Sequence, residues 1–435
     1  MGVARMAIDS EVLVVGGGLA GLTSALAAAR AGADVRLLSH KRSTLRNASG
    51  LVDVLGYAPD GEGPLVDPFE TIPELPECHP YRTVGVETIR EGLSLFDDAV
   101  PGYRGGHTDR NALVPTHGGT VKPTARYPAS TAAGLASDAR GTLLVGFEAL
   151  TDFDAAHAAA HLEAAGVPFE VRGVTVRFPG DLRADAGVTR YAALLDGDGV
   201  TVEGRSVSVR KALAERLKPH LGEAERVGFP AVLGDEDPAG VREGLADALG
   251  ADVFEVPMGP PSLPGLRLAE RLFDALDAAG ARIETGNPVV GYDAEDGGGS
   301  DAVRVDRVFV DKNGAKIPYA ADQYVLATGG LVGKGVDSDR ETVGEPVFGC
   351  HVPHPEDRYE WFADDAFGDH PFARFGVETD GDLRPLDGRG NPECANLRAA
   401  GAVLGGYDFA AEKSGSGVSI ATGYAAGRSA AEVVA

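Results

Sequence analysis

Residues 12–21, Val-Leu-Val-Val-Gly-Gly-Gly-Leu-Ala-Gly, join an apolar run to a cluster of glycines. A continuous apolar run is typical of a buried parallel strand. The spacing Gly16-x-Gly18-x-x-Gly21 predicts a tight turn, a close approach of backbone to a pyrophosphate, and a helix packed against the strand. Leu19 and Ala20 lie between the last two glycines, so we expect all five residues to line a phosphate site.

The surroundings of this motif support a nucleotide-binding interpretation. Residues 22–31 predict a helix and residues 34–38 predict a second strand, which completes a β-α-β unit. A secretory signal would need a basic segment before the apolar run, whereas Arg5 is followed by Asp9 and Glu11. A membrane helix is also disfavoured, because the run contains a glycine cluster and barely reaches spanning length.

The composition is strongly acidic. The 435 residues include 65 Asp and Glu against 40 Lys and Arg, of which only 8 are Lys, and the formal net charge is −25. Such a charge repels nucleic acids and anionic membranes, which excludes both as direct partners. The acids are scattered rather than gathered in a tail, so they predict a solvated surface. This pattern favours a halophilic source, in whose high-salt cytoplasm self-repulsion is screened.

The cysteines indicate a reducing compartment. Cys78, Cys350 and Cys394 form no Cys-x-x-Cys pair and no iron–sulfur spacing. Their odd number and the lack of a recognisable leader favour the cytoplasm. No later segment is long and apolar enough to span a membrane. We therefore expect a cytoplasmic protein without a metal centre.

The order of predicted elements indicates a discontinuous arrangement of α/β class. Residues 1–58 and 266–435 predict an FAD/NAD(P)-binding Rossmann-like flavoprotein fold, and residues 59–265 predict an inserted α+β domain that faces substrate or partners. In the insert we expect helices at 86–100, 154–166, 208–221 and 241–249, and strands at 142–146 and 226–229. After it we expect a helix at 266–279 and strands at 282–284, 288–292, 303–310 and 323–330.

Two further glycine motifs turn the nucleotide site into a flavin site. A strand ending Ala327-Thr328-Gly329 follows a β-meander that contains Val290, and flavoproteins with two dinucleotide-binding domains place such a strand beside the cofactor. A strand at 396–401 then precedes a final helix, whose start in flavoproteins points its dipole at the flavin ring. The residues expected to contact flavin here are Gly401, Gly405, Gly415, Gly417 and Val418.

A narrower resemblance comes from five segments that occur in one order. They are Ser49-Gly50-Leu-Val-Asp-Val-Leu55, His79-Pro-Tyr81, Pro260-Pro-Ser262 with Arg267, Phe375-Gly-Val-x-Thr-Asp380-x-x-Leu-Arg-Pro385, and Gly401-x-Val-Leu-Gly-Gly406. Over essentially its full length the chain resembles the B subunit of anaerobic glycerol-3-phosphate dehydrogenase. The resemblance adds Ser49 and Gly50 to the expected cofactor residues.

This resemblance implies a respiratory enzyme of three subunits. The FAD-bearing A subunit oxidises sn-glycerol 3-phosphate to dihydroxyacetone phosphate, and the iron–sulfur C subunit passes electrons to membrane quinone. The B subunit is the flavin partner, described for the family as an FMN protein. The chain would then be cytoplasmic, or peripheral at the inner face of the membrane through its partners. Its missing cysteine clusters and membrane spans suit this division of labour.

One position departs from the usual flavoprotein pattern. The second strand usually ends in an acid that binds the adenosine ribose, but here it leads into Ser39, His40 and Lys41. Either the site holds FMN and never binds adenosine, or Ser39 bonds the ribose weakly and FAD binds. The family description favours FMN and the general fold favours FAD; we favour FMN.

The candidates for chemistry are Arg384, His79 and Lys122. A dehydrogenating site needs a base near the substrate carbinol and cations for its phosphate. Arg384 ends a Thr-Asp-x-x-Leu-Arg stretch that resembles the flavin-facing segment of fumarate-reductase-like enzymes. Two other hypotheses stay open: a free-standing flavin oxidoreductase acting on another small anionic substrate, and a flavin-free scaffold protein. The three glycines argue against the scaffold, and the missing ribose acid argues for it.

Overall fold

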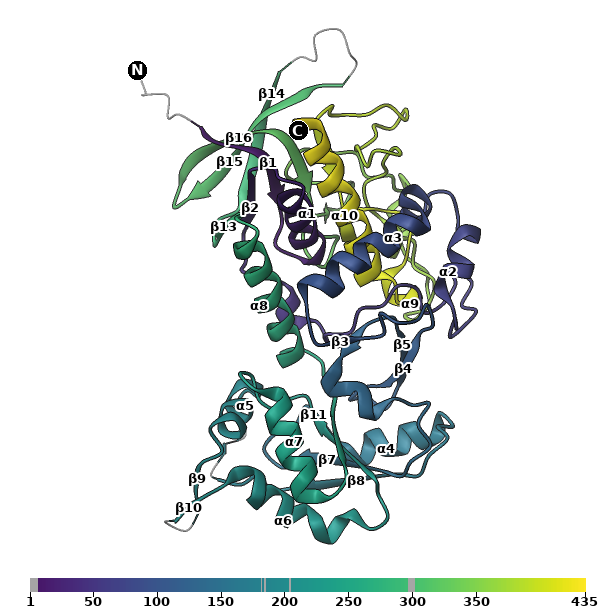
Figure 1. Ribbon diagram of the computed structural model, residues 1–435. Coiled ribbons are helices and arrows are strands. Elements are labelled where there is room, and N and C mark those ends of the chain that lie inside the picture. The colour runs from purple at the N-terminus through teal and green to yellow at the C-terminus, as the bar shows by residue number, and fades with distance from the viewer. Residues whose placement is uncertain (1–6, 181, 184, 203–204, 296–301) are drawn as a thin grey trace. The chain divides into compact units, whose positions relative to one another are not determined.

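The computed structural model describes residues 7–180, 182–183, 185–202, 205–295 and 302–435 (Figure 1). The chain divides into two compact units. Unit 1 contains residues 1–44, 53–101 and 271–435, and unit 2 contains residues 45–52 and 102–270. Residues 59–101, expected in the insert, fall in unit 1 because helix α3 (Pro80–Ala99) packs on the last helix, α10 (Gly415–Val434).

Unit 1 is built on a seven-stranded sheet with the order β13-β2-β1-β16-β15-β14, and β19 also pairs with β16. Strands β13, β2, β1, β16 and β19 are parallel, whereas β15 and β14 form an antiparallel meander. The apolar run that predicted a buried strand lies at the centre of this sheet, where Val12, Leu13 and Val14 are fully buried. The strands of this sheet are β1 (Ile8–Val15), β2 (Val35–Ser39), β13 (Arg282–Thr285), β14 (Val289–Glu295), β15 (Arg304–Lys312), β16 (Ala315–Leu326) and β19 (Leu397–Ala399). A separate antiparallel pair joins β17 (Asp337–Ser338) to β18 (Val343–Gly344).

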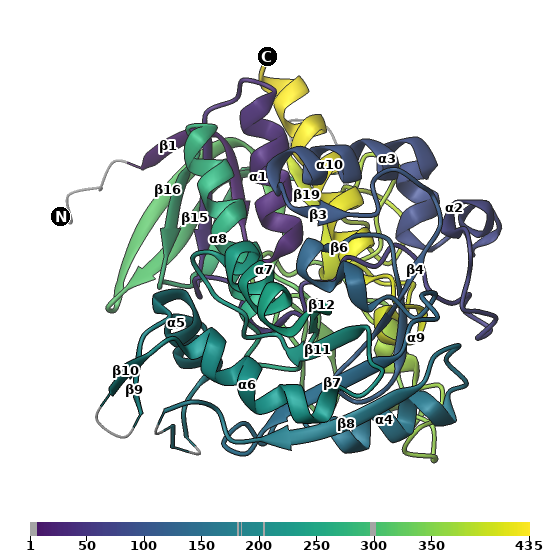
Figure 2. The same cartoon turned by 60° about the horizontal axis from the view of Figure 1, so that its bottom comes forward.

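Two helices pack closely in unit 1. Helix α1 (Leu19–Arg30) connects β1 to β2, and α10 lies beside it in both views (Figures 1 and 2). A Cβ at Gly427 of α10 would lie 2.2 Å from the carbonyl oxygen of Ser24, so the two backbones meet with no side chain between them. The Ser24 hydroxyl donates to the Gly423 carbonyl at 2.8 Å and joins the helices. The shorter helices of the unit are α2 (Pro68–Thr71) and α9 (Phe409–Glu412).

Unit 2 contains a four-stranded parallel sheet with the order β12-β11-β7-β8. Its core includes Phe147, which stacks on Tyr191 and meets Phe178 edge-on, with ring centroids 5.7 and 5.1 Å apart. The main elements are β7 (Thr142–Phe147), α4 (Ala155–Ala164), β8 (Val171–Val176), α5 (Val188–Gly197), α6 (Val209–Leu221), β11 (Arg226–Pro230), α7 (Pro238–Leu249) and β12 (Asp252–Val256). Helix α8 (Leu263–Ala278) begins in unit 2 and continues into unit 1 from Arg271. Short antiparallel pairs join β3 (Tyr103–Arg104) to β6 (Tyr127–Pro128), β4 (Ala112–Pro115) to β5 (Val121–Thr124), and β9 (Val200–Val202) to β10 (Arg205–Val207).

The predicted helices and strands are present, with shifted ends. The largest shift is in β16, predicted at residues 323–330 and observed at Ala315–Leu326. Among the helices the largest shift is in α3, predicted from residue 86, which begins at Pro80. His79 caps its first turn by accepting a hydrogen bond from the N–H of Tyr81, and proline is favoured at the first helical position. Gly85 has a φ of +79° and kinks the helix, which explains why the periodicity is regular only after it.

Two of the three thiols are inaccessible, and this gives a first test of the fold. We expect the native protein to be alkylated at pH 8 on the exposed Cys78 alone, and the denatured protein on all three cysteines. Burial raises the pKa of the Cys394 thiol to about 12, and it also raises that of Cys350. A raised pKa leaves almost no thiolate at pH 8, and the thiolate is the reactive form. Mass spectrometry of alkylated peptides measures this; rapid native labelling of Cys350 or Cys394 would contradict the packing.

Candidate functional site

Most of the predicted cofactor residues gather at one edge of the unit 1 sheet. Because β1, β2, β16 and β19 are parallel, they all end at this carboxyl edge. The N–H of Gly16 donates to the Leu38 carbonyl, and that of Ala327 donates to the Val15 carbonyl, each at 2.8 Å. These bonds bring the ends of three strands together. In open α/β sheets, ligands bind at this edge.

Gly16 and Gly21 are required by close contacts. Gly16 has a φ of +126°, and a Cβ there would lie 2.0 Å from the carbonyl oxygen of Ala327. A Cβ at Gly21 would lie 1.9 Å from the carbonyl oxygen of Gly16. The first glycine thus lets β1 turn against β16, and the third lets α1 lie on that turn, as the motif predicts.

Gly18 lies next to open space instead. It is the N-cap residue of α1, no side chain caps the helix, and a Cβ there would meet only the Thr44 hydroxyl, at 3.6 Å. Leu19 and Ala20 form the first turn, where backbone N–H groups lack partners within a helix. An uncapped helix start facing open space fits a bound phosphate group.

Thr328 adds a second feature that fits a ligand. Thr328 lies two residues beyond the end of β16. Its Oγ1 is buried and has no hydrogen-bond partner. Buried hydroxyls nearly always have a partner, so an unpaired one at a binding edge fits a group that accepts from or donates to it. Gly329, with a φ of +88°, turns the chain immediately afterwards.

The loop after β2 differs from the usual ribose site. Ser39 is buried and its hydroxyl donates to the Lys41 carbonyl, so the loop already uses this group. His40 and Lys41 are exposed. Gly17 was missed as a site residue, yet a Cβ there would lie 2.5 Å from the Ser39 Oγ. Its only signal in the sequence is its place inside the triple glycine.

Gly401, which follows β19, packs against the first turn of α1. It has a φ of +78°, and a Cβ there would lie 2.5 Å from the Cβ of Ala20. Its N–H donates to the Thr422 hydroxyl of α10 at 2.9 Å. A Cβ at Gly405, four residues later, would lie 2.9 Å from the carbonyl oxygen of Gly376, so the backbones of these two glycines are in contact. Gly401 thus lies against the first turn of α1.

The start of α10 is held by a residue that sequence reasoning missed. The Gly417 N–H donates to the Asp53 carbonyl at 2.7 Å, and the Asp53 N–H donates to the Ser416 hydroxyl at 3.1 Å. A Cβ at Gly417 would lie 2.2 Å from the Tyr81 hydroxyl oxygen, which explains the glycine. Gly415 and Val418 belong to the same turn. The segment around Asp53 therefore determines where this helix begins.

His79 lies in a closed cluster behind that helix start. It is fully buried, its Nδ1 accepts from the Tyr81 N–H, and its Nε2 lies 3.1 Å from the Glu412 carboxylate. Because Nδ1 is an acceptor, the ring proton is on Nε2 and is donated to Glu412. Glu412 also accepts from the Ser414 hydroxyl at 3.0 Å. Burial raises the pKa of the Tyr81 phenol, which stays protonated and donates to the Val54 carbonyl at 2.6 Å.

Arg384 and Lys122 have different surroundings. The Arg384 guanidinium is paired with Asp380 through Nε at 2.8 Å and Nη2 at 2.7 Å, and its side chain is one-third exposed. Lys122 is half-buried on β5 of unit 2.

The remaining predicted cofactor residues lie in both units. Ser49 and Gly50 belong to unit 2, whereas Val290 lies on β14 of unit 1 and is 41 % exposed. These residues thus come from separate parts of the chain.

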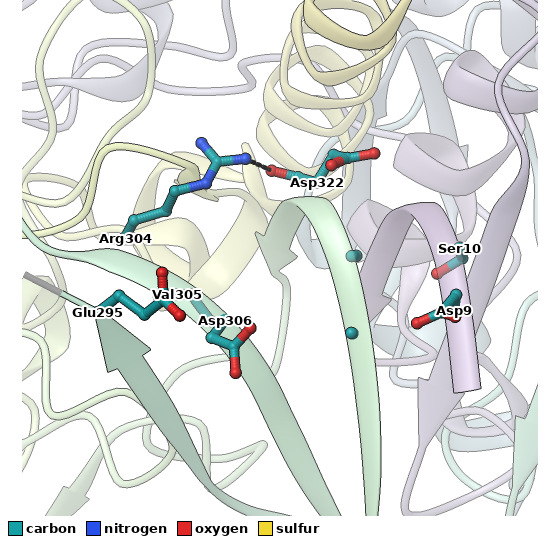
Figure 3. Close-up of a pocket in the computed structure, with 9 residues that line it drawn as sticks. Asp9, Ser10, Glu295, Arg304, Val305, Asp306 and Asp322 are labelled. Atoms are coloured by element: carbon teal, nitrogen blue, oxygen red, sulfur yellow. Dashed lines mark hydrogen bonds between the residues drawn. The ribbon is translucent and has the colours of Figure 1, made fainter. Parts of the chain in front are cut away.

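A pocket of about 330 Å³ lies at the opposite, amino end of β1 (Figure 3). Arg304 lies there and donates to the Asp322 carbonyl at 3.1 Å. Along β1 this end is roughly 20 Å from the glycine turn. The residues that line the pocket are Asp9, Ser10, Glu295, Arg304, Val305, Asp306, Ala320, Ala321 and Asp322. It is therefore separate from the predicted cofactor site.

The part of the chain that the structure describes contains neither a clustered metal site nor a membrane-spanning helix. There, no group of three or more His, Cys, Asp or Glu side chains is arranged to hold a metal ion. Over the same residues, no helix combines the length and the apolarity that crossing a bilayer requires.

Comparison with known proteins identifies close relatives. Residues 11–418 match the FAD binding domain family. A Halobacterium salinarum protein, named as the probable B subunit of anaerobic glycerol-3-phosphate dehydrogenase, is 71 % identical, covering 99 % of each chain. A Vibrio cholerae protein, named as the B subunit of the same enzyme, is 31 % identical, covering 95 % of this chain and 94 % of its own. A solved flavocytochrome c3 fumarate reductase matches with 12 % identity and a TM-score of 0.44, over 99 % of this chain and 79 % of that one.

These matches confirm the predicted fold class, and the Halobacterium relative fits the halophilic composition. The relatives are named as one subunit, which indicates a protein that works in a complex of several subunits. The chain belongs to the FAD binding domain family and, within it, to the family of the B subunit of anaerobic glycerol-3-phosphate dehydrogenase.

Proposed function

We propose that this chain is the flavin subunit of a quinone-linked glycerol-3-phosphate dehydrogenase and takes part in oxidising sn-glycerol 3-phosphate to dihydroxyacetone phosphate. One observation carries the proposal: the uncapped start of α1 faces open space at Gly18, at the carboxyl edge of the parallel sheet. A phosphate-binding edge of this kind supports flavin binding in a chain whose relatives carry that activity in their names.

The residues of the edge suggest how a flavin would be held. Gly16, Gly18 and Gly21, with Leu19 and Ala20, would bind its phosphate through backbone N–H groups. The segments Ala327–Gly329 and Gly401–Gly405, and the start of α10, would surround the rest. A bound flavin would supply the two-electron acceptor chemistry. The positive end of the α10 dipole would stabilise negative charge on a reduced ring.

We favour FMN over FAD as that flavin. The Ser39 hydroxyl is bonded to the Lys41 carbonyl, and no carboxylate ends β2 to bind the two ribose hydroxyls of an adenosine. His40 and Lys41 are exposed and would bind a phosphate better than a diol. FAD is the cofactor in the name of the matching family, so it is the alternative to test.

The partners that we propose are the FAD-bearing A subunit, which oxidises the substrate, together with the iron–sulfur C subunit. In this arrangement the chain works in the cytoplasm, at the inner face of the membrane through those partners. Arg384, whose side chain is one-third exposed, is the candidate in unit 1 for binding the substrate phosphate. Lys122, on β5 of unit 2, is a separate candidate. His79 has both ring nitrogens engaged and is fully buried, which suits a positioning role better than contact with substrate.

Identifying the released flavin tests this proposal. We expect denaturation of the purified protein to release about one FMN per chain, identified by chromatography. Release of FAD would overturn the preference for FMN but keep the flavin function, and absence of any flavin would favour a scaffold. Turnover of glycerol 3-phosphate with an artificial acceptor is then measured with and without the FAD-bearing partner. Full turnover by this chain alone would favour a free-standing oxidoreductase.

A further inference from the structure

Exposed aromatic side chains gather in one short segment of unit 1. Tyr359, Phe362, Phe367 and Phe372, together called the aromatic patch, are 73, 43, 99 and 42 % exposed. Among the described residues, five large aromatic side chains are at least 42 % exposed, and four of them fall within the 14 positions from 359 to 372. Because only 6 % of the chain is aromatic, such a concentration is not a random scatter. The rings of Tyr359 and Phe362 contact each other, with centroids 6.5 Å apart. Exposed apolar side chains gathered in one region mark interaction sites.

The segment that carries the aromatic patch is an ordered structure. The Phe372 N–H donates to the Trp361 carbonyl at 2.9 Å, and the Ala363 N–H donates to Nδ1 of His370 at 3.1 Å. These bonds bring the two ends of the segment together. The Trp361 ring packs edge-on against His354 and Phe375, with centroids 5.6 and 6.2 Å apart. An aromatic inner layer thus supports the exposed outer one, and a preorganised surface loses little entropy on binding.

The charges around the aromatic patch restrict what can cover it. Residues 356–374 contain six exposed acids against two arginines, a net charge of −4. One arginine, Arg374, is already paired with Asp369 at 2.7 Å. An anionic lipid surface would be repelled by this rim. A second copy bound face to face would place the same acids against each other, because a two-fold interface joins identical patches. The acids are Glu356, Asp357, Glu360, Asp364, Asp365 and Asp369.

We infer that the aromatic patch is the surface on which this chain docks to another subunit of its complex. The partner would present an apolar groove flanked by Arg or Lys side chains, which complements aromatic rings within an acidic rim. This inference rests on the proposed function, since it requires a complex of several subunits. In high salt the rim charges act only at contact distance, so the rings supply most of the affinity and close pairs of the acids with the partner's bases supply the orientation.

The test removes the two central rings from the full-length, flavin-loaded chain. We expect Phe362→Ala/Phe367→Ala to weaken, by about 30-fold or more, binding to one of the two proposed partners, the FAD-bearing or the iron–sulfur one. Flavin content and melting temperature should not change, because these side chains are exposed. Calorimetric titration of each purified partner at about 2 M KCl, where surface charges are screened, measures the affinity. Phe367→Ala alone, at a position 99 % exposed, gives a second variant that cannot disturb the core.

The control removes two exposed apolar side chains elsewhere in unit 1. Val66→Ala/Val433→Ala, at positions 59 and 60 % exposed, should bind both partners with unchanged affinity. Unchanged binding by the patch variants would overturn the docking surface alone, whereas a wild-type chain that binds neither partner would overturn the proposed complex as well. A wild-type dimer that the patch variants dissociate, or vesicle binding that they abolish, would assign the surface to a second copy or to a membrane instead.

Discussion

Gly21→Ala should lower the free energy of unfolding by about 3 kcal/mol or more and abolish flavin binding. A Cβ at this position would lie 1.9 Å from the carbonyl oxygen of Gly16, which is backbone and cannot swing away. Gly16 is itself confined, because a Cβ there would lie 2.0 Å from the Ala327 carbonyl. Helix α1 would have to move off the strand, and its phosphate-facing N-terminus would move with it. Guanidinium denaturation and quantification of released flavin measure the two effects.

Gly197→Ala is the matched control, since Gly197 also lies in a helix, α5. No heavy atom lies within 4 Å of a Cβ built there, so the change should be neutral or stabilise by up to about 1 kcal/mol. Flavin content should stay at the wild-type level. If the two alanine variants were equally stable, close contact would not be the reason for glycine at position 21.

His79→Ala should cost about 3–5 kcal/mol of stability, the second large effect. Glu412 is 1 % exposed, and the change removes the His79 Nε2–H that donates to its carboxylate. It also removes the N-cap of α3 and leaves a void beside Tyr81 and Tyr407, whose rings contact His79. The Glu412 carbonyl accepts from Gly56 and Tyr57, so the segment that holds the start of α10 should loosen too. Denaturation curves measure the loss.

A second variant separates the cap from the buried pair. His79→Asn keeps a side-chain oxygen that can accept from the Tyr81 N–H, so we expect it to recover about 1 kcal/mol of the loss. His107→Ala, at an exposed position, should change stability by less than about 0.5 kcal/mol. If His79→Asn were as stable as the wild type but abolished turnover, His79 would act on substrate rather than position the helix.

Local patterns were sufficient to predict the first β-α-β unit and the presence of the strands that follow, but not where those strands begin and end. The apolar run at residues 12–15 indicated a buried strand. Gly21 is explained by a contact with the backbone of Gly16, five residues earlier, whereas Gly16 is explained by Ala327, far along the chain. Ala327 and Gly401, expected near the flavin from glycine motifs, lie at the same edge of the sheet because parallel strands end together. The start of α3 was missed because a histidine is an unusual N-cap and Gly85 interrupts the periodicity.

The buried polar cluster could not be predicted. Glu412 and Asp53 are single acids in an acidic chain, and nothing local separates them from the solvated acids around them. Glu412 lies 333 positions from His79, and Asp53 lies 363 positions from Ser416. Such pairs form only because α3 and α10 pack together. The role of Gly17 was hidden in the same way, since its constraint comes from Ser39 on the next strand.

The sequence by itself therefore determined the glycine turn, the parallel strands and the family, because glycine spacing and apolar runs are local patterns typical of a β-α-β unit. The tertiary structure alone decided which acids are buried and what holds the start of α10. It also decided that the Ser39 hydroxyl donates a hydrogen bond to the Lys41 carbonyl of its own loop, and which aromatic rings are left exposed. The physical reason is that burial and partner choice depend on segments hundreds of residues apart, whose packing no local pattern records.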